Sequence, residues 1–189
     1  MTIELFKTFD SIGAPDPRNT NVFTRDDATG EVSRFTLAEL HKRLSDCTLN
    51  AAVPEDIQNH FLTARHLALY SWFVYRFEPV AQMQAFASLE FALRKRLGYE
   101  AAGERGPTLA PLLKEAVKLR LLMDERFRDW PGHFEPHWDG TSATAWLEGD
   151  ALEYLTTMRN EFAHGSFTLF ADGGRALRMS ADGINQLFD

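Results

Sequence analysis

The segment "RNEFAH", residues 159–164, brings an arginine, an asparagine and a histidine together within six residues. A histidine side chain, with an unperturbed pKa of about 6.5, accepts and donates protons near neutral pH. The guanidinium of an arginine fits a phosphate group and neutralises charge that develops at phosphorus. The amide of Asn160 can orient either partner. Arg159, Asn160 and His164 therefore have the side-chain chemistry for metal-independent cleavage of a phosphodiester.

The helix that must position these residues is predicted over residues 151–164. Asp150 and Glu153 form a capping-box pair at its start, and Gly165 is a typical residue just beyond a helix end. At about 100° per residue, the apolar side chains gather on one side, which we expect to face the core of a helical bundle. That side consists of Ala151, Leu152, Leu155, Met158 and Phe162, with Tyr154 beside them.

Polar residues form a second stripe on the opposite side of this predicted helix. The stripe contains Glu153, Thr157, Asn160 and His164. Asn160 and His164 are four residues apart and can contact the same object. Arg159 lies at the border of the stripe, about 140° around the helix from His164, so only its long flexible stem can bring the guanidinium to the histidine. The pattern therefore directs the motif away from the core of its own chain.

Two interpretations of the polar stripe remain open from the pattern. In the first, the stripe is a solvated face, with His164 favourably placed at the carbonyl end of the helix and Arg159 paired with a carboxylate. In the second, the stripe is a catalytic surface. One Arg–His set makes a sparse active site, whereas two copies that meet across a twofold axis would give a more complete one.

The string "MRNEFAHG" resembles the signature of the HEPN superfamily, which is an arginine, a polar residue and, a few residues later, a histidine near a helix end. Arg159, Asn160 and His164 match that pattern residue by residue. The fold that the resemblance implies is a compact bundle of four or five helices with the motif in a late helix. The resemblance covers about residues 54–165.

The resemblance implies an RNA-cutting toxin, defence or RNA-processing endonuclease. It further implies a homodimer through the motif-bearing helix, RNA as the substrate, and a cognate antitoxin or another protein as partner. His164 would handle protons around the 2′-hydroxyl, Arg159 would stabilise the phosphorane and Asn160 would orient them. Some members of the family lack activity, so the alternative is a helical domain that only binds a protein or RNA. No cofactor and no metal are expected.

The chain is predicted to be a single compact domain of the mainly α class, a four- to five-helix up-down bundle with small β-hairpins near both termini. Residues 1–53 form an N-terminal extension with a hairpin over residues 22–35. A short helix follows, for which Thr36 and Glu39 make a capping box. After the bundle, residues 166–189 are predicted as a second hairpin, with "ADGG" as its turn, and a short helix.

Three long helices are expected in the bundle before the motif-bearing one. The first, residues 54–77, is apolar on almost every side from Leu67 to Tyr75, which predicts deep burial. The second opens at Pro79 and stops at Gly98. The third covers residues 108–127, and its apolar side is predicted to consist of Leu112, Leu113, Ala116, Leu119 and Met123.

The charge of the chain is uneven. Its net value is −7, so the whole surface will not attract nucleic acid indiscriminately. The basic stretch, Arg94 to Arg128, contains nine basic and five acidic residues, a net of +4, which leaves −11 for the remainder. RNA binding would therefore be local, although solvated helix faces are the more ordinary explanation of such a stretch. Glu90 and Arg94 are expected to form an i, i+4 ion pair.

The "HFEPH" segment offers a weaker alternative site, because it places His133 and His137 on either side of Glu135. Two histidines and a carboxylate can bind a metal. However, Pro136 prevents a helical face with both histidines, and no third ligand cluster is evident in the sequence. We expect these residues to pack as a loop and not to form a metal site.

The remaining candidates are single residues. His66 is expected to be a satisfied core histidine, because it lies in the most apolar predicted helix. Cys47, the one cysteine, has no neighbour that suggests a nucleophile and suits a reducing compartment. The first residues, "MTIELFKTFD", carry charges where a signal peptide needs an apolar run, and the apolar segment 67–75 is shorter than the roughly 20 residues that span a bilayer. These features predict a cytoplasmic protein with no membrane partner.

Overall fold

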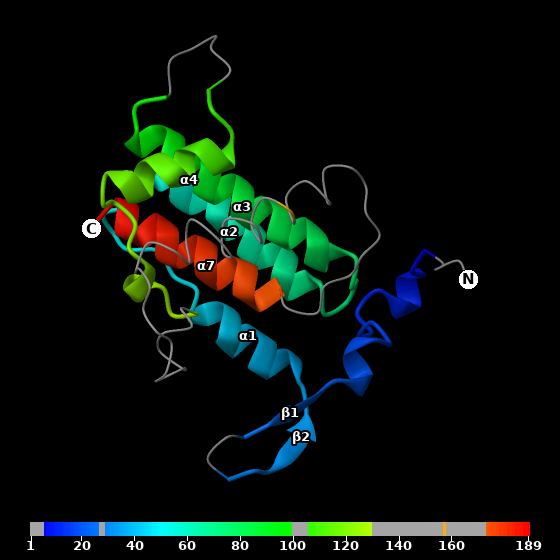
Figure 1. Ribbon diagram of the computed structural model, residues 1–189. Coiled ribbons are helices and arrows are strands. Elements are labelled where there is room, and N and C mark those ends of the chain that lie inside the picture. The colour runs from blue at the N-terminus through cyan, green and yellow to red at the C-terminus, as the bar shows by residue number, and fades with distance from the viewer. Residues whose placement is uncertain (1–5, 27–28, 100–105, 130–156, 158–172) are drawn as a thin grey trace.

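The computed structural model describes residues 6–26, 29–99, 106–129, 157 and 173–189. Within these residues the chain is mainly helical, as predicted, with five α-helices and one antiparallel two-stranded sheet (Figure 1). In chain order the elements are β1 Phe23–Arg25, β2 Val32–Arg34, α1 Leu37–Ser45, α2 Glu55–Tyr70, α3 Phe77–Arg96, α4 Leu109–Lys118 and α7 Gly173–Leu187, with 3₁₀ turns at Phe9–Ser11, Asn19–Asn21 and Asp124–Arg126.

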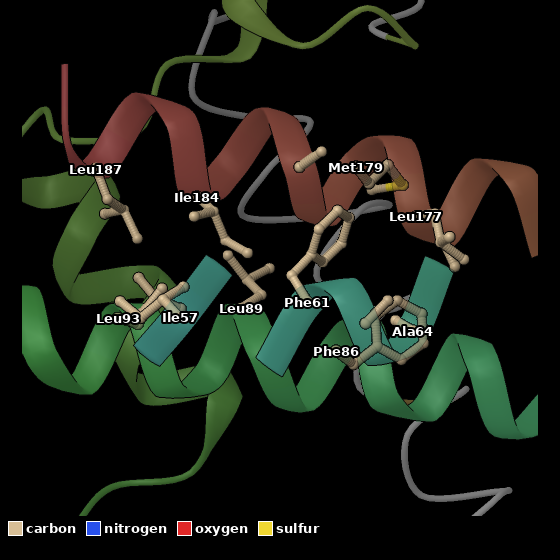
Figure 2. Packing of buried hydrophobic residues seen from close by; sticks show 14 of the residues in the cluster. Ile57, Phe61, Ala64, Phe86, Leu89, Leu93, Leu177, Met179, Ile184 and Leu187 are labelled. Atoms are coloured by element: carbon tan, nitrogen blue, oxygen red, sulfur yellow. The ribbon is translucent and has the colours of Figure 1, made fainter. Parts of the chain in front are cut away.

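The core lies between α2, α3 and α7. α2 and α3 pack against each other, and α7 packs mainly on α3. Figure 2 shows Phe61 of α2, Leu89 of α3 and Ile184 of α7 pointing into the same space. Each of these side chains is at most 1% exposed. Since a fully buried side chain of this size contributes roughly 1.5–3 kcal/mol, contacts of this kind among the three helices hold the fold together.

The N-terminal hairpin and the helix after it form as predicted. In the sheet, Phe23 pairs with Arg34 and Arg25 with Val32. The capping box of α1 is complete, because the Glu39 N–H donates to Thr36 Oγ1 at 3.2 Å and the Thr36 N–H donates to the Glu39 carboxylate at 2.7 Å. These bonds satisfy backbone donors that the first turn of a helix leaves unpaired.

α2 ends at Tyr70, so the predicted continuous helix to residue 77 is wrong. The turn over residues 71–76 is held by the N-terminal segment. Asn19 Nδ2 donates to two carbonyls of this turn at 3.0 Å, and Asp16 accepts a backbone N–H from it at 3.1 Å. These buried polar side chains provide partners that a continued helix would have supplied internally. Tyr70, predicted to be deeply buried, is 55% exposed.

α3 begins two residues before the predicted start and stops at the predicted glycine. Pro79 lies in the first turn, where a missing N–H removes no helical hydrogen bond. Gly98 has a φ of +80°, and the N–H groups of Gly98 and Tyr99 donate to carbonyls of the last turn at 3.3 and 2.8 Å. This Schellman arrangement fixes the chain direction after the helix and so the position of Tyr99.

α4 is shorter than predicted. It stops at Lys118 because Arg120 takes a φ of 57°, and the N–H groups of Arg120 and Leu121 donate back to carbonyls of the last turn at 2.9 Å. This cap has the hydrogen bonds of a Schellman motif, with an arginine at the position where glycine is usual. Leu119, predicted to face the core, is 56% exposed, whereas Leu122 is 1% exposed.

α7 corrects the predicted C-terminal hairpin. The helix begins at Gly173 and continues through the residues predicted as the second strand. The buried apolar residues recur at helical spacing: Ala176, Leu177, Ala181, Ile184 and Leu187. Packing of this face on α3 outweighs the turn preference of the glycine pair, as tertiary context often outweighs local propensity. The first predicted strand, residues 166–170, lies outside the described residues.

Candidate functional site

The residues of the predicted catalytic site lie outside the described part of the chain: Arg159, Asn160 and His164. The "HFEPH" segment, residues 133–137, lies outside it as well. Within the predicted motif helix the structure describes Thr157, which is helical and exposed. Thr157 belongs to the predicted polar stripe, and at this one position the side chain is directed outward.

The basic stretch, which is described apart from residues 100–105, separates into paired and unpaired cations. Arg94 Nη2 lies 2.6 Å from Glu90 Oε1, which confirms the predicted ion pair, and it also donates to the Pro107 carbonyl at 3.2 Å. Lys95 Nζ lies 2.6 Å from Asp56 Oδ2 of α2. The hydrogen bond from Lys95 lowers the pKa of the Asp56 carboxyl. These two cations connect α3 to its neighbours, so their charge is already compensated.

Arg126 and Arg128 are paired with carboxylates in and just after α7. Arg128 Nε donates to Asp182 Oδ1 at 2.8 Å, its backbone N–H donates to Oδ2 at 2.9 Å, and Arg126 pairs with Asp189. Asp182 is 9% exposed, and burial raises the pKa of its carboxyl although Arg128 opposes that shift. A carboxylate held in this position needs both hydrogen bonds. The two arginines therefore attach the segment after α4 to α7.

Lys114, Lys118 and Arg120 are exposed, and no ion pair joins them to any described residue. Lys114 and Lys118 are four residues apart on the outward face of α4, which places their Cβ atoms about 5–6 Å apart. Tyr99 reaches the same face, because its hydroxyl donates to Glu115 Oε2 at 2.9 Å, and this hydrogen bond raises the pKa of Tyr99. The tyrosine is 40% exposed. An exposed aromatic ring beside cations is suited to contact with a single-stranded nucleic acid.

A serine and a histidine also meet inside the bundle, which the sequence did not signal. His60 Nδ1 of α2 lies 2.8 Å from Ser88 Oγ of α3. The serine hydroxyl also lies 2.8 Å from the Gln84 carbonyl, to which it donates. Ser88 is fully buried. A nucleophilic serine must donate to the histidine and reach a substrate, so this pair joins two helices and is not a catalytic dyad.

A pocket of about 230 Å³ lies between the N-terminal hairpin, α1, α2 and α7. Two arginines line it, and both have partners. Arg43 stacks on Phe35 at 4.6 Å, and Arg178 lies 3.1 Å from Asp129. Cys47 also lines the pocket, and burial raises the pKa of its thiol, so the sulfur stays protonated and unreactive at neutral pH. The described residues of this pocket therefore offer packing and no evident reactive group.

His66 differs from its prediction, because it is an exposed residue of α2 and not a core histidine. It lies on the outward side of the helix, between the buried positions Ala64 and Ala68. Among the residues that the structure describes, no three histidine, cysteine or acidic side chains are grouped so as to hold a metal ion. None of the described helices combines the length and apolar character of a membrane span.

Comparison of the chain with protein families, with curated proteins and with solved structures finds no match in any of the three. The motif residues and the geometry of the described surface are therefore the observations that bear on function.

Proposed function

We propose that this protein is a HEPN-like, metal-independent endoribonuclease that acts as a homodimer through the motif-bearing helix. The observation that carries the proposal is the motif itself, Arg159, Asn160 and His164 on the outward stripe of a predicted helix that ends at Gly165. Toxin, defence and RNA-processing roles are all compatible with this chemistry, and a cognate antitoxin is a natural partner for the first of them.

Two features of the described residues support the proposal. The described part of the chain is mainly helical, and a helical bundle is what the HEPN resemblance implies. The unpaired cations of α4 also provide a local basic surface on a chain whose net charge is −7. Such a surface is what an acidic protein needs to attract RNA at one place and not everywhere.

In the proposed reaction, His164 acts as general base and accepts the proton of a ribose 2′-hydroxyl. The 2′-oxygen attacks the adjacent phosphorus, and the bond from phosphorus to the 5′-oxygen breaks. The products are a 2′,3′-cyclic phosphate and a 5′-hydroxyl, whose oxygen takes up a proton. Arg159 stabilises the negative charge that develops on the phosphorane oxygens, and Asn160 orients these groups. The attacking group is the 2′-hydroxyl, so DNA cannot be a substrate.

The test compares RNA cleavage by the wild type and by His164→Ala, with EDTA present. We expect the wild type to cut RNA to cyclic-phosphate ends and to leave DNA of the same sequence intact. His164→Ala should lose at least about 100-fold in rate, because general acid–base catalysis typically contributes that much. His66→Ala is the matched control, since His66 is an exposed histidine on a different helix, and it should cut at the wild-type rate. Equal cleavage by the wild type and His164→Ala, or by neither, would contradict the proposed catalysis.

The second candidate is a HEPN-like domain that binds a partner without catalysis. A surface cleft favours it, because apolar side chains from the N-terminal segment and from the turn between α2 and α3 line about 790 Å³ of space. Phe6 and Tyr70, both in this lining, are 99% and 55% exposed. Exposed apolar surface of this kind often marks a protein-binding site. Absence of cleavage by pure wild-type protein on mixed RNA would favour this candidate.

A further inference from the structure

We propose that the outward face of α4 binds the backbone of single-stranded RNA. This face consists of Lys114, Lys118 and Tyr99, and together with the exposed Arg120, which follows α4 in the chain, it is here called the α4 track. The inference rests on the proposed function, since it takes RNA as the substrate, and it names the surface along which the RNA lies.

The cations of the α4 track are free to bind an anion. Arg94, Lys95, Arg126 and Arg128, elsewhere in the basic stretch, each lie within 4 Å of a carboxylate. Lys114, Lys118 and Arg120 have no such contact with a described residue and are exposed. RNA phosphates can therefore approach them without breaking an ion pair of the described fold.

Helix stability explains only part of the arrangement of these cations. Lys118 lies in the last turn of α4, where a cation interacts favourably with the carbonyl end of the helix. Lys114 places a like charge at position i−4 from Lys118, which destabilises a helix slightly. Arg120 occupies a left-handed conformation that favours glycine. Binding of an anion at this face gives a role to the two cations that helix stability does not explain.

The track also contains an aromatic platform. The Schellman cap at Gly98 sets the position of Tyr99, and the bond from its hydroxyl to Glu115 at 2.9 Å holds the ring against α4. Stacking of a base on an exposed aromatic ring is tolerant of sequence, because every base has a π-face. Positive charge together with such a ring distinguishes a single-strand track from a surface for duplex RNA, whose bases are already stacked.

One acidic side chain lies on the same face. Glu115 is oriented toward the Tyr99 hydroxyl, so its charge is partly engaged in that hydrogen bond. The described face therefore carries two cations, Lys114 and Lys118, against one carboxylate, and the exposed Arg120 follows in the chain. It is locally positive, although the chain as a whole is acidic.

The test measures the affinity for a fluorescent single-stranded RNA of about 20 nucleotides at salt concentrations from about 50 to about 200 mM. His164→Ala is the background, so that the probe is not cut. Lys114→Gln with Lys118→Gln should flatten the slope of log affinity against log salt by about 1.4, which is about 0.7 for each phosphate contact removed. Tyr99→Ala should weaken binding about tenfold without changing the slope. Tyr99→Phe keeps the ring but loses the hydrogen bond to Glu115, so it should weaken binding less than Tyr99→Ala.

The matched control replaces two exposed cations outside the track, Arg34→Gln with Lys42→Gln. It changes the net charge equally and should leave the slope unchanged. An equal slope change in the control, an unchanged slope in the track variant, or no RNA binding at all would overturn the track. Cleavage that depends on His164, with an unchanged slope in the track variant, would overturn the track alone. A flattened slope without cleavage would support the track and contradict the nuclease.

Discussion

The basic residues on α4 and those that follow it are close in sequence but differ in what they contact. Arg128 lies against a carboxylate of α7 and Arg126 against that of Asp189 just beyond it, so they attach one segment of the chain to another. Lys114 and Lys118, about ten residues earlier, face outward without a described ionic partner. The first pair explains part of the stability of the fold, and the second pair does not.

This difference shows why the net charge of a stretch does not identify a binding surface. The basic stretch counts as +4 in the sequence, yet the carboxylates that compensate Lys95, Arg126 and Arg128 come from α2 and from the C-terminal residues. Within the described part of the basic stretch, Lys114 and Lys118 of α4 keep no ionic partner, as does Arg96 at the end of α3. Substitutions of single residues and pairs distinguish the stabilising cations from those of the α4 track.

The largest effect is expected from Asp182→Ala. Removing this buried carboxylate leaves the backbone N–H and the guanidinium of Arg128 without their partner, and we expect a loss of about 2 kcal/mol in the free energy of unfolding. Arg128 Nη1 also donates to the Asp46 carbonyl at 2.9 Å, next to the buried Cys47. The thiol, which is 1% exposed in the wild type, should therefore become accessible to a thiol reagent as well. Denaturant unfolding and the rate of thiol modification measure the two effects.

Asp182→Asn is the control for this prediction. The amide keeps one acceptor of similar shape, so its loss should be smaller than that of Asp182→Ala, and Cys47 should stay largely protected. RNA affinity should be unchanged in both variants, because Asp182 lies on α7 and not on the α4 track. If either variant binds RNA more weakly while its stability is unchanged, the cations paired with carboxylates can no longer be distinguished from those of the α4 track.

An intermediate effect of opposite sign is expected from Arg120→Gly. Arg120 has a φ of 57°, a conformation that glycine adopts without the steric cost of a Cβ atom. We expect the variant to be more stable by about 1 kcal/mol and to bind RNA with a slope flattened by about 0.7. Arg120→Asn serves as comparison, since asparagine tolerates the same backbone conformation and also lacks the charge. Lower stability of the glycine variant would show that the arginine side chain itself supports the cap.

Local signals predicted the parts of the fold that depend on neighbouring residues. The capping box of Thr36 and Glu39, the stop at Gly98 and the ion pair of Glu90 with Arg94 each involve residues at most four apart, and all three are confirmed. The interior of the bundle was predicted less well. Asp16 and Asn19 end α2 through bonds to a turn more than fifty residues away, and no pattern within α2 indicates them.

The C-terminal hairpin was predicted wrongly for a related reason. The glycine pair of its predicted turn, Gly173 and Gly174, begins α7 instead. A glycine pair that begins a helix and one that makes a turn look the same in a sequence, because the packing of α7 on α3 decides between them. In the same way, the sequence shows the basic stretch but not which of its cations form ion pairs. The carboxylates that pair with Lys95, Arg126 and Arg128 come from α2 and from the C-terminal residues. The catalytic prediction at Arg159, Asn160 and His164 concerns residues outside the described part of the chain and stays a prediction.

The smallest effect on stability is expected where the effect on RNA binding is largest. Lys114→Gln with Lys118→Gln removes two exposed like charges at positions i and i+4, so the free energy of unfolding should change by no more than about 0.5 kcal/mol, and toward greater stability. Lys95→Gln is the contrasting variant, because it breaks the ion pair with Asp56 and should destabilise the protein at low salt. Denaturant unfolding at low and high salt measures both. If the double variant unfolds more easily than Lys95→Gln, the lysines of α4 stabilise the fold, and their exposure no longer argues for a binding role.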